Sequence, residues 1–103
     1  MAAPVPQLLY QGAISSTPGS LYAPSTSVWV KTIVVCNGNT TAETVDVFCN
    51  GTSTTANRLF RVVLAANETY IFAASIGLKA STDSIQGGTT TSSKVVMSIF
   101  GAA

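Results

Sequence analysis

The sequence predicts an all-β protein: a single antiparallel β-sandwich or jelly-roll-like domain of about eight short strands, with an extended N-terminal arm. Short runs rich in β-branched and aromatic residues recur along the chain, and clusters of Gly, Pro, Asn and Ser separate them. No segment shows the apolar period of about 3.6 residues that is typical of a helix. The length of 103 residues suits one domain, and regularly spaced short strands are typical of two packed antiparallel sheets.

The N-terminal region is expected to hold the arm and two short strands. Residues 1–6 contain two prolines among mostly small residues, so we expect an extended arm ahead of a sandwich domain over residues 7–103. Residues 7–14 form the first expected strand, and a turn rich in Ser, Pro and Gly ends it. Residues 20–23 form the second, which stops before Pro24.

The clearest strand covers residues 27–37, where β-branched and aromatic side chains dominate. Both of its alternating faces are largely apolar, with Val28, Val30, Val34 and Cys36 on one face and Trp29, Ile33 and Val35 on the other. A strand that is apolar on both faces is typical of a central strand covered on both sides. In a domain of this size the second cover can be another subunit.

Two strands are expected in the middle of the chain. Residues 44–50 alternate well, with Val45, Val47 and Cys49 inward and Phe48 among the outward positions. After a polar loop, residues 59–64 form the next expected strand.

The C-terminal part is expected to add three strands. Residues 69–73 form one of them, and the Ala-rich residues 73–77 have room for a single helical turn. Residues 84–86 form a short strand, and the Gly- and Thr-rich residues 87–91 are expected to be a flexible turn. Residues 93–100 alternate again and form the last strand.

Charge is scarce in this sequence. It has five basic and four acidic residues, no His, a net charge of +1 and 47% apolar residues. Globular proteins usually have about a quarter charged residues, so much of this surface has to be neutral, which suits contact with other proteins. The scattered basic residues predict no nucleic-acid partner, and no apolar run is long enough to cross a membrane. The N-terminus lacks signal-peptide features, so we expect a soluble protein made in a cytoplasm.

The sequence predicts no enzyme, cofactor or metal site. Without His, general base catalysis near neutral pH would fall to a perturbed carboxylate, Lys or Cys. Glu43 and Asp46 are three residues apart, which on a strand places them on opposite faces and excludes a carboxylate pair. Two Cys without His do not complete a tetrahedral zinc shell.

The two cysteines and the aromatic residues allow alternatives. Cys36 and Cys49 are expected to be buried thiols in a reducing cytoplasm, with a disulfide across a hairpin as the alternative. Trp29 and the three tyrosines are expected to pack in the core or an interface, with a sugar-binding platform as the alternative.

Several segments share an order and spacing with a known group of proteins. They are Leu-Tyr-Ala-Pro at residues 21–24, Trp-Val-Lys-Thr-Ile-Val-Val-Cys-Asn at 29–37, Thr-Val-Asp-Val-Phe at 44–48, Leu-Ala-Ala-Asn-Glu-Thr at 64–69, Leu-Lys-Ala-Ser-Thr-Asp-Ser-Ile at 78–85, and Val-Met-Ser-Ile-Phe-Gly at 96–101. Over residues 20–101 this outline resembles small β-sandwich accessory proteins of tailed-bacteriophage virions. The resemblance rests on apolar strand positions and turn residues, and it includes no catalytic signature.

The resemblance implies a non-enzymatic structural protein of a tailed-phage virion. The leading expectation is a head decoration or cement protein that binds the capsid exterior through protein contacts. The alternatives are a neck, tail or fibre component and a carbohydrate-binding, receptor-binding module. The implied partners are further copies of the chain, most often in a trimer, and the major capsid protein or other virion proteins.

The interface residues are expected in the arm, at the start of the first strand and at two aromatic strand positions that one subunit leaves uncovered. They are Ala2, Ala3, Pro4, Val5, Pro6, Gln7, Leu8, Leu9, Trp29 and Phe48.

Overall fold

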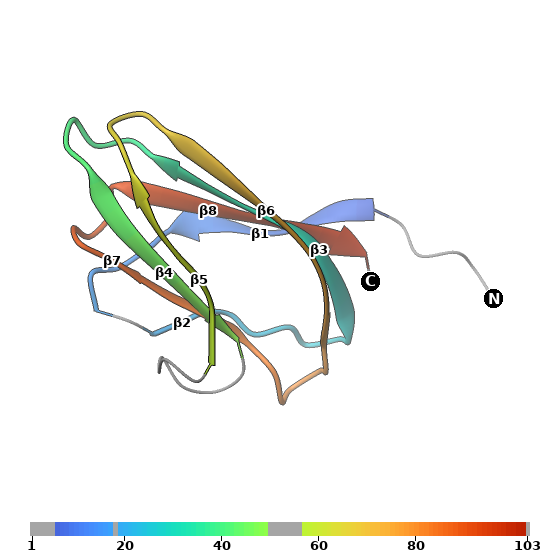
Figure 1. The fold of residues 1–103 in the computed structure, drawn as a ribbon. Coiled ribbons are helices and arrows are strands. Elements are labelled where there is room, and N and C mark those ends of the chain that lie inside the picture. The colour runs from blue at the N-terminus through green and yellow to red at the C-terminus, as the bar shows by residue number, and fades with distance from the viewer. Residues whose placement is uncertain (1–5, 18, 50–56, 103) are drawn as a thin grey trace.

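The computed structural model of this protein describes residues 6–17, 19–49 and 57–102 (Figure 1). These residues form two four-stranded antiparallel sheets, which confirms the predicted all-β sandwich. The strands are β1 (Pro6–Ala13), β2 (Gly19–Tyr22), β3 (Val28–Asn37), β4 (Glu43–Cys49), β5 (Arg58–Leu64), β6 (Thr69–Leu78), β7 (Ile85–Thr89) and β8 (Val95–Ala102). Within the described ranges there is no helix with the length and apolar character needed to span a membrane.

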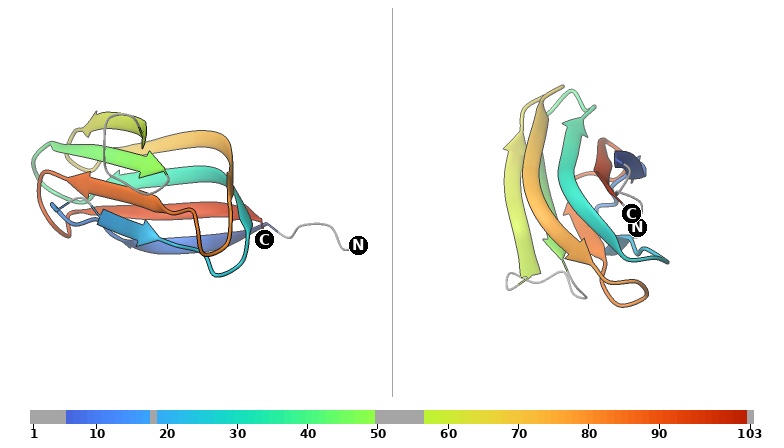
Figure 2. Two further views of the ribbon diagram at one scale, coloured as in Figure 1. Left: turned by 90° about the horizontal axis from the view of Figure 1, so that it is seen from below. Right: turned by 90° about the vertical axis from the view of Figure 1, so that its right-hand side faces the viewer.

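The strand order identifies the connectivity of a jelly roll. One sheet has the order β1-β8-β3-β6 and the other β2-β7-β4-β5. The left view of Figure 2 shows the second sheet in front of the first. In these sheets β1 pairs with β8, β2 with β7, β3 with β6, and β4 with β5. The chain is therefore one long antiparallel hairpin rolled into two layers, which is how a jelly roll is built.

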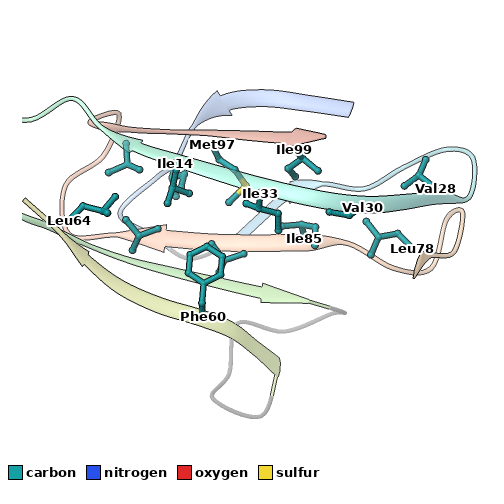
Figure 3. Close-up of a cluster of buried hydrophobic side chains, with 14 residues drawn as sticks. Ile14, Val28, Val30, Ile33, Phe60, Leu64, Leu78, Ile85, Met97 and Ile99 are labelled. Carbon is teal, nitrogen blue, oxygen red and sulfur yellow. The ribbon is translucent and has the colours of Figure 1, made fainter. Parts of the chain in front are cut away.

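The core lies between the two sheets and follows the alternation of the strands (Figure 3). On β8, Val95, Met97 and Ile99 are fully buried, while Val96 and Phe100 remain exposed on the opposite side. This is the pattern that the sequence predicts for residues 93–100. It leaves each sheet with one face on the core and one face outside.

A bulge in β3 explains why this strand is apolar on both faces. The pairing of β3 with both neighbours shifts register between Val30 and Thr32. Before the shift Val28 and Val30 face the core, and after it Ile33 and Val35 do. The expectation that Val34 and Cys36 share a face with Val28 is therefore wrong, because one extra residue reverses the alternation.

Two segments expected to be irregular belong to strands. Residues 73–77 continue β6 alongside β3 and form no helical turn, because the pairing outweighs the helix propensity of Ala. Residues 87–89 lie in β7, between β2 and β4. A Cβ at Gly87 would lie 2.9 Å from Leu21 Cδ1 and 3.2 Å from the Asp46 carbonyl oxygen, so a larger residue here would require Leu21 and β4 to shift.

Aromatic rings fill both open sides of the sandwich. The rings of Tyr10 on β1 and Tyr22 on β2 have centroids 5.9 Å apart. Between β5 and β6, the Phe60 ring lies 5.2 Å from that of Tyr70 and 4.8 Å from that of Phe72. The apolar interior is therefore covered along both edges, and exposed apolar surface must be sought on the outer faces of the sheets.

Candidate protein interface

The outer side of the sheet β1-β8-β3-β6, which we call the outer face, gathers exposed apolar side chains. Among the described residues, the large apolar side chains that remain exposed are Leu8, Trp29, Val63, Ile71, Val96 and Phe100. All except Val63 belong to strands of this one sheet. Isolated exposed apolar residues are ordinary, but a cluster on one face is a common sign of a binding surface.

Cross-strand pairing makes these side chains contiguous. Phe100 on β8 is opposite Leu8 on β1 and Thr32 on β3. Val96 is opposite Cys36 of β3. Side chains directly opposite on neighbouring strands have Cβ atoms about 5 Å apart, so the residues form a continuous surface of apolar and small polar groups.

Lys31 is the only charged residue in the four strands of this sheet. Its Nζ lies 5.6 Å from the centroid of the Trp29 ring and donates a hydrogen bond of 3.0 Å to Ser75 Oγ. The ammonium group is therefore held locally by a cation–π contact and a hydroxyl group. The rest of the outer face is neutral.

Hollows lie at the end of the outer face that carries Trp29. One of about 470 Å³ is lined by Gln7, Leu8, Lys31, Phe100, Gly101 and Ala102. A second of about 280 Å³ is lined by Trp29, Lys31, Ser75 and Ala102. A third of about 310 Å³ is lined by Trp29 and extends to Lys79 and Asp83. Trp29 thus borders two of these hollows, and hollows of this kind can accept protruding side chains.

The outer side of the other sheet has a different chemistry. Asp46 accepts hydrogen bonds of 2.8 and 3.0 Å from Arg61, and Arg58 Nε lies 3.3 Å from the same carboxylate. The hydrogen bonds from Arg61 to Asp46 raise the pKa of the guanidinium. The charges of this domain therefore concentrate away from the outer face.

The structure places the two predicted aromatic interface residues differently. Trp29 is 52% exposed, as expected for a side chain that its own subunit leaves uncovered. Phe48 points away from the core, between core positions Val47 and Cys49, but it is only 5% exposed. Its cross-strand neighbours are the long side chains of Arg58 and Gln86. The expectation that Phe48 remains uncovered is therefore wrong.

The predicted N-terminal interface residues divide into two groups. Ala2, Ala3, Pro4 and Val5 lie outside the described residues. Pro6, Gln7, Leu8 and Leu9 belong to β1 and run along β8. Leu8 is exposed on the outer face, whereas Leu9 packs against the core. The part of this segment that contributes to the exposed apolar surface is therefore Leu8.

Ile71, Val96 and Phe100 were missed as interface candidates. Each occupies an outward position next to buried or half-buried apolar residues on a β-rich strand. The alternation could have identified them, because it places them on the same sheet face as Trp29 once β6 and β8 are known to flank β3.

The cysteines lie in different sheets, and no disulfide joins them. Cys49 is half-buried, and burial together with the negative charge of Asp83 raises the pKa of its thiol. Cys36 is exposed on the outer face, where Thr69 Oγ1 donates a hydrogen bond of 3.3 Å to its sulfur. The expectation of a buried thiol is therefore wrong for Cys36.

The aromatic residues considered for a sugar platform are dispersed. Tyr10 and Tyr22 lie together on one open side of the sandwich, and Tyr70 lies on the other. Trp29 stands on the outer face. The structure therefore does not bring the four rings into one platform.

Glu43 is a buried acid at the end of the sandwich where Asn37 closes β3. Its side chain is 1% exposed and accepts hydrogen bonds of 2.8 Å from Thr91 N and 3.1 Å from Asn39 Nδ2. Burial raises the pKa of this carboxyl, but the hydrogen bonds and the positive charge of Lys94 outweigh burial and lower it overall. Every named partner is a loop group, so Glu43 holds loops together.

Neither a metal-binding cluster nor a related protein identifies a function for this chain. Nowhere in residues 6–17, 19–49 and 57–102 do three His, Cys, Asp or Glu side chains gather in a way that could hold a metal ion. Comparison with known protein families and with curated proteins finds no match for this chain.

Proposed function

We propose that this chain is a non-enzymatic structural protein of a tailed-phage virion, a decoration or cement protein that attaches to the outside of the head. The outer face carries this proposal, because its exposed apolar residues need a protein cover. Four strands about 4.8 Å apart, and about eight residues long at ~3.3 Å per residue, span roughly 500 Å² in projection. Exposed apolar side chains share this area with small polar ones, and clustered apolar surface of this kind is often functional.

Two similarities to other proteins support a location in the virion. The outline over residues 20–101 resembles accessory proteins of tailed-phage virions. The jelly-roll connectivity recurs in viral capsid and lectin domains. The second association is an analogy between folds, which by itself carries less weight than a binding site does.

The physical properties of the chain suit attachment to a repetitive particle. A neutral contact surface depends little on ion pairs, so its binding tolerates changes in salt. Linked copies on a symmetric lattice raise the overall affinity by about 10²–10⁴-fold over a single contact. Weak individual contacts are then sufficient for lasting attachment.

A carbohydrate-binding module is the second candidate, because the exposed Trp29 ring lines two hollows, of about 310 and 280 Å³. Rings of this kind stack on sugar faces. A glycan array with the wild type and Trp29→Ala tests this candidate. A sugar-specific signal that the substitution abolishes would favour the lectin function over the structural one.

Electron microscopy of the phage particle, combined with co-sedimentation of the purified protein, tests the proposal. We expect the protein to co-sediment with heads and to add regular density on the capsid exterior. A single ring at the neck, or density only on fibres, would move the assignment to those sites. Failure to bind any part of the particle would overturn it.

A further inference from the structure

The four edge strands of the sandwich differ in how they are protected against pairing with another strand. The edges are β1 and β6 in one sheet and β2 and β5 in the other (Figure 2). An edge strand presents unpaired backbone N–H and C=O groups, to which a further strand can bond. Proteins usually prevent such pairing with a short strand, a charge, a proline or a bulge. An edge without these features can accept a partner.

β6 is the least protected of the four edges. β2 is four residues long, β1 begins with a proline and contains a bulge, and β5 carries two arginines. β6 has ten residues, and none of them is charged or a proline. Its bulge, where Ala74 and Ser75 lie opposite Lys31, leaves residues 69–73 in regular pairing with β3. Residues 69–73 therefore form a regular, uncharged edge.

The backbone of this edge is unpaired on one side. Within the described ranges, β3 is the only strand that pairs with β6, and no hydrogen bond joins the backbone of residues 69–73 to a loop or a side chain. Successive residues of a strand direct their N–H and C=O groups to alternate sides. Every second residue of this run therefore has backbone groups directed away from β3. Such an edge recognises the backbone of another extended strand.

We infer that β6 of a second copy of this chain pairs with this edge, antiparallel, about a two-fold axis that passes perpendicular to the sheet beside Ile71. The two sheets then join into one continuous sheet. Ile71, which is 65% exposed, lies opposite its own counterpart, and the half-buried Tyr70 lies opposite Phe72 of the second copy. Cross-strand pairs of aromatic and β-branched side chains stabilise a sheet.

The composition of the edge favours a second copy over other strands. Residues 69–73 read Thr-Tyr-Ile-Phe-Ala, and the first four are strong strand formers. Because the run has no charge, two copies meet without like-charge repulsion. The N-terminal residues 1–6 are a poorer partner, because their two prolines have no N–H to donate to a ladder. Pairing about a two-fold axis is also closed, since each β6 occupies the edge of the other.

The faces of the sheet restrict the arrangement. Residues opposite each other in an antiparallel pair point to the same side, and Ile71 is outward whereas Tyr70 and Phe72 pack against the core. A register shifted by one residue would oppose residues of different faces and is excluded. An axis along the strands would join the outer face of one copy to the core side of the other. The register centred on Ile71 uses the regular run and avoids the bulge.

Sedimentation velocity of the full chain over a range of concentrations tests the pairing with charge variants. We expect a wild-type dimer that dissociates on dilution. Ile71→Lys and Ile71→Glu should each raise the dissociation constant at least about tenfold, because like charges then lie opposite each other. An equimolar mixture of the two variants should associate again, because opposite charges meet. No recovery in the mixture would contradict the two-fold axis beside Ile71.

Val96→Lys and Val96→Glu are the matched controls. Val96 is exposed on the same outer face, but it lies on β8, two strands away from the edge. We expect neither variant to change the dissociation constant. Effects equal to those at Ile71 would indicate contact through the face of the sheet and overturn the inference.

Amide hydrogen exchange tests the backbone pairing without any substitution. Above the dissociation constant, we expect every second amide of residues 69–73 to exchange at least about tenfold more slowly than in the dilute protein. The amides of the edge strand β5 should exchange at the same rate in both. A dimer that leaves exchange of residues 69–73 unchanged would overturn the inference, as would a trimer or a monomer at every concentration.

Deletion of residues 2–5 tests the other occupant, and we expect it to leave the dissociation constant unchanged. Loss of the dimer would identify the N-terminal segment as the added strand and overturn pairing by β6. The inference goes beyond the proposed function, and the two can fail separately. A monomer that decorates heads would overturn the inference alone, and a β6-paired dimer that binds no particle would overturn the proposed function alone.

Discussion

The indole ring of Trp29 packs over Gly77, its cross-strand neighbour on β6, where a Cβ atom would lie 3.4 Å from ring atom Cζ3. The ring covers backbone that a glycine would otherwise expose, a compensation known for glycines in edge strands. Trp29 therefore has a role within the subunit as well as on the outer face. A substitution of Trp29 can therefore change the stability of the subunit as well as binding at the outer face.

Gly77→Ala is expected to keep the fold and to raise the free energy of unfolding by about 0.5 kcal/mol, because the added methyl group finds ordinary contact and restricts the unfolded chain. Gly101→Ala is the matched comparison, and we expect it to lower the free energy of unfolding. A Cβ at position 101 would overlap the carbonyl oxygen of Trp29, so we expect a loss of about 3 kcal/mol or more. Urea unfolding of both variants checks the contrast, and similar midpoints would contradict the close approach of β8 and β3.

Lys31→Met is expected to strengthen binding to phage heads by up to about tenfold, or ~1.4 kcal/mol. Lys31 is the one charge within the strands of the outer face, and covering it with a partner removes water from the ammonium group. Co-sedimentation of wild type and variant with heads measures this change. Weaker binding of Lys31→Met would show that the ammonium group contributes a favourable contact across the interface.

Acid is expected to destabilise the domain through Glu43. Its pKa is lowered in the folded state, so its contribution is present above the unfolded pKa, about pH 4, and is lost as pH falls through the folded value. Glu43→Gln should cost about 2 kcal/mol near neutral pH, because a hydrogen-bonded buried charge is replaced. The variant should also lose less stability than wild type below about pH 4. Parallel curves of unfolding free energy against pH would argue against this role.

Two deletions separate the N-terminal segment from β1. Removal of residues 2–5 is expected to leave the unfolding temperature unchanged and to weaken binding to phage heads. Removal of residues 2–9 also deletes the first half of β1, including Leu9 of the core, and should lower the unfolding temperature clearly. Thermal unfolding and co-sedimentation check the pair. Full head binding by the shorter deletion would exclude an attachment role for residues 2–5.

Cys36 provides a native reporter for the covered face. It is exposed there, so a partner that covers the face shields its thiol. In a Cys49→Ser background we expect thiol labelling of Cys36 to slow when the protein is bound to phage heads. Labelling at the same rate with and without heads would mean that Cys36 remains uncovered.

Much of the fold follows from local sequence patterns. The alternation over residues 93–100 predicts which side of β8 enters the core, and β-branched runs locate the strands because such side chains pack well on a pleated surface. The place of Gly87 in β7 does not follow from these patterns, because it depends on close packing by Leu21, which is far away in the chain.

The candidate site was harder to predict, because it depends on register and on long-range neighbours. The bulge near Lys31 moves Cys36 from the expected core face to the outer face. Phe48 is outward but covered, and its burial follows from the identity of the two strands beside β4. Glu43 resembles an ordinary turn acid until the loops of Asn39 and Thr91 fold over it. These effects leave no local pattern in the sequence.

The pairing of Pro6 with Ala102 has a practical consequence for handling this protein. It brings the first and last strands together at one corner, as Figure 1 shows for the start of β1 and the end of β8. The start of β1 at Pro6 and the end of β8 at Ala102 therefore lie beside the hollow that Leu8 and Phe100 line. A purification handle that crowds this corner can obstruct docking there, so binding measurements call for protein from which it has been cleaved.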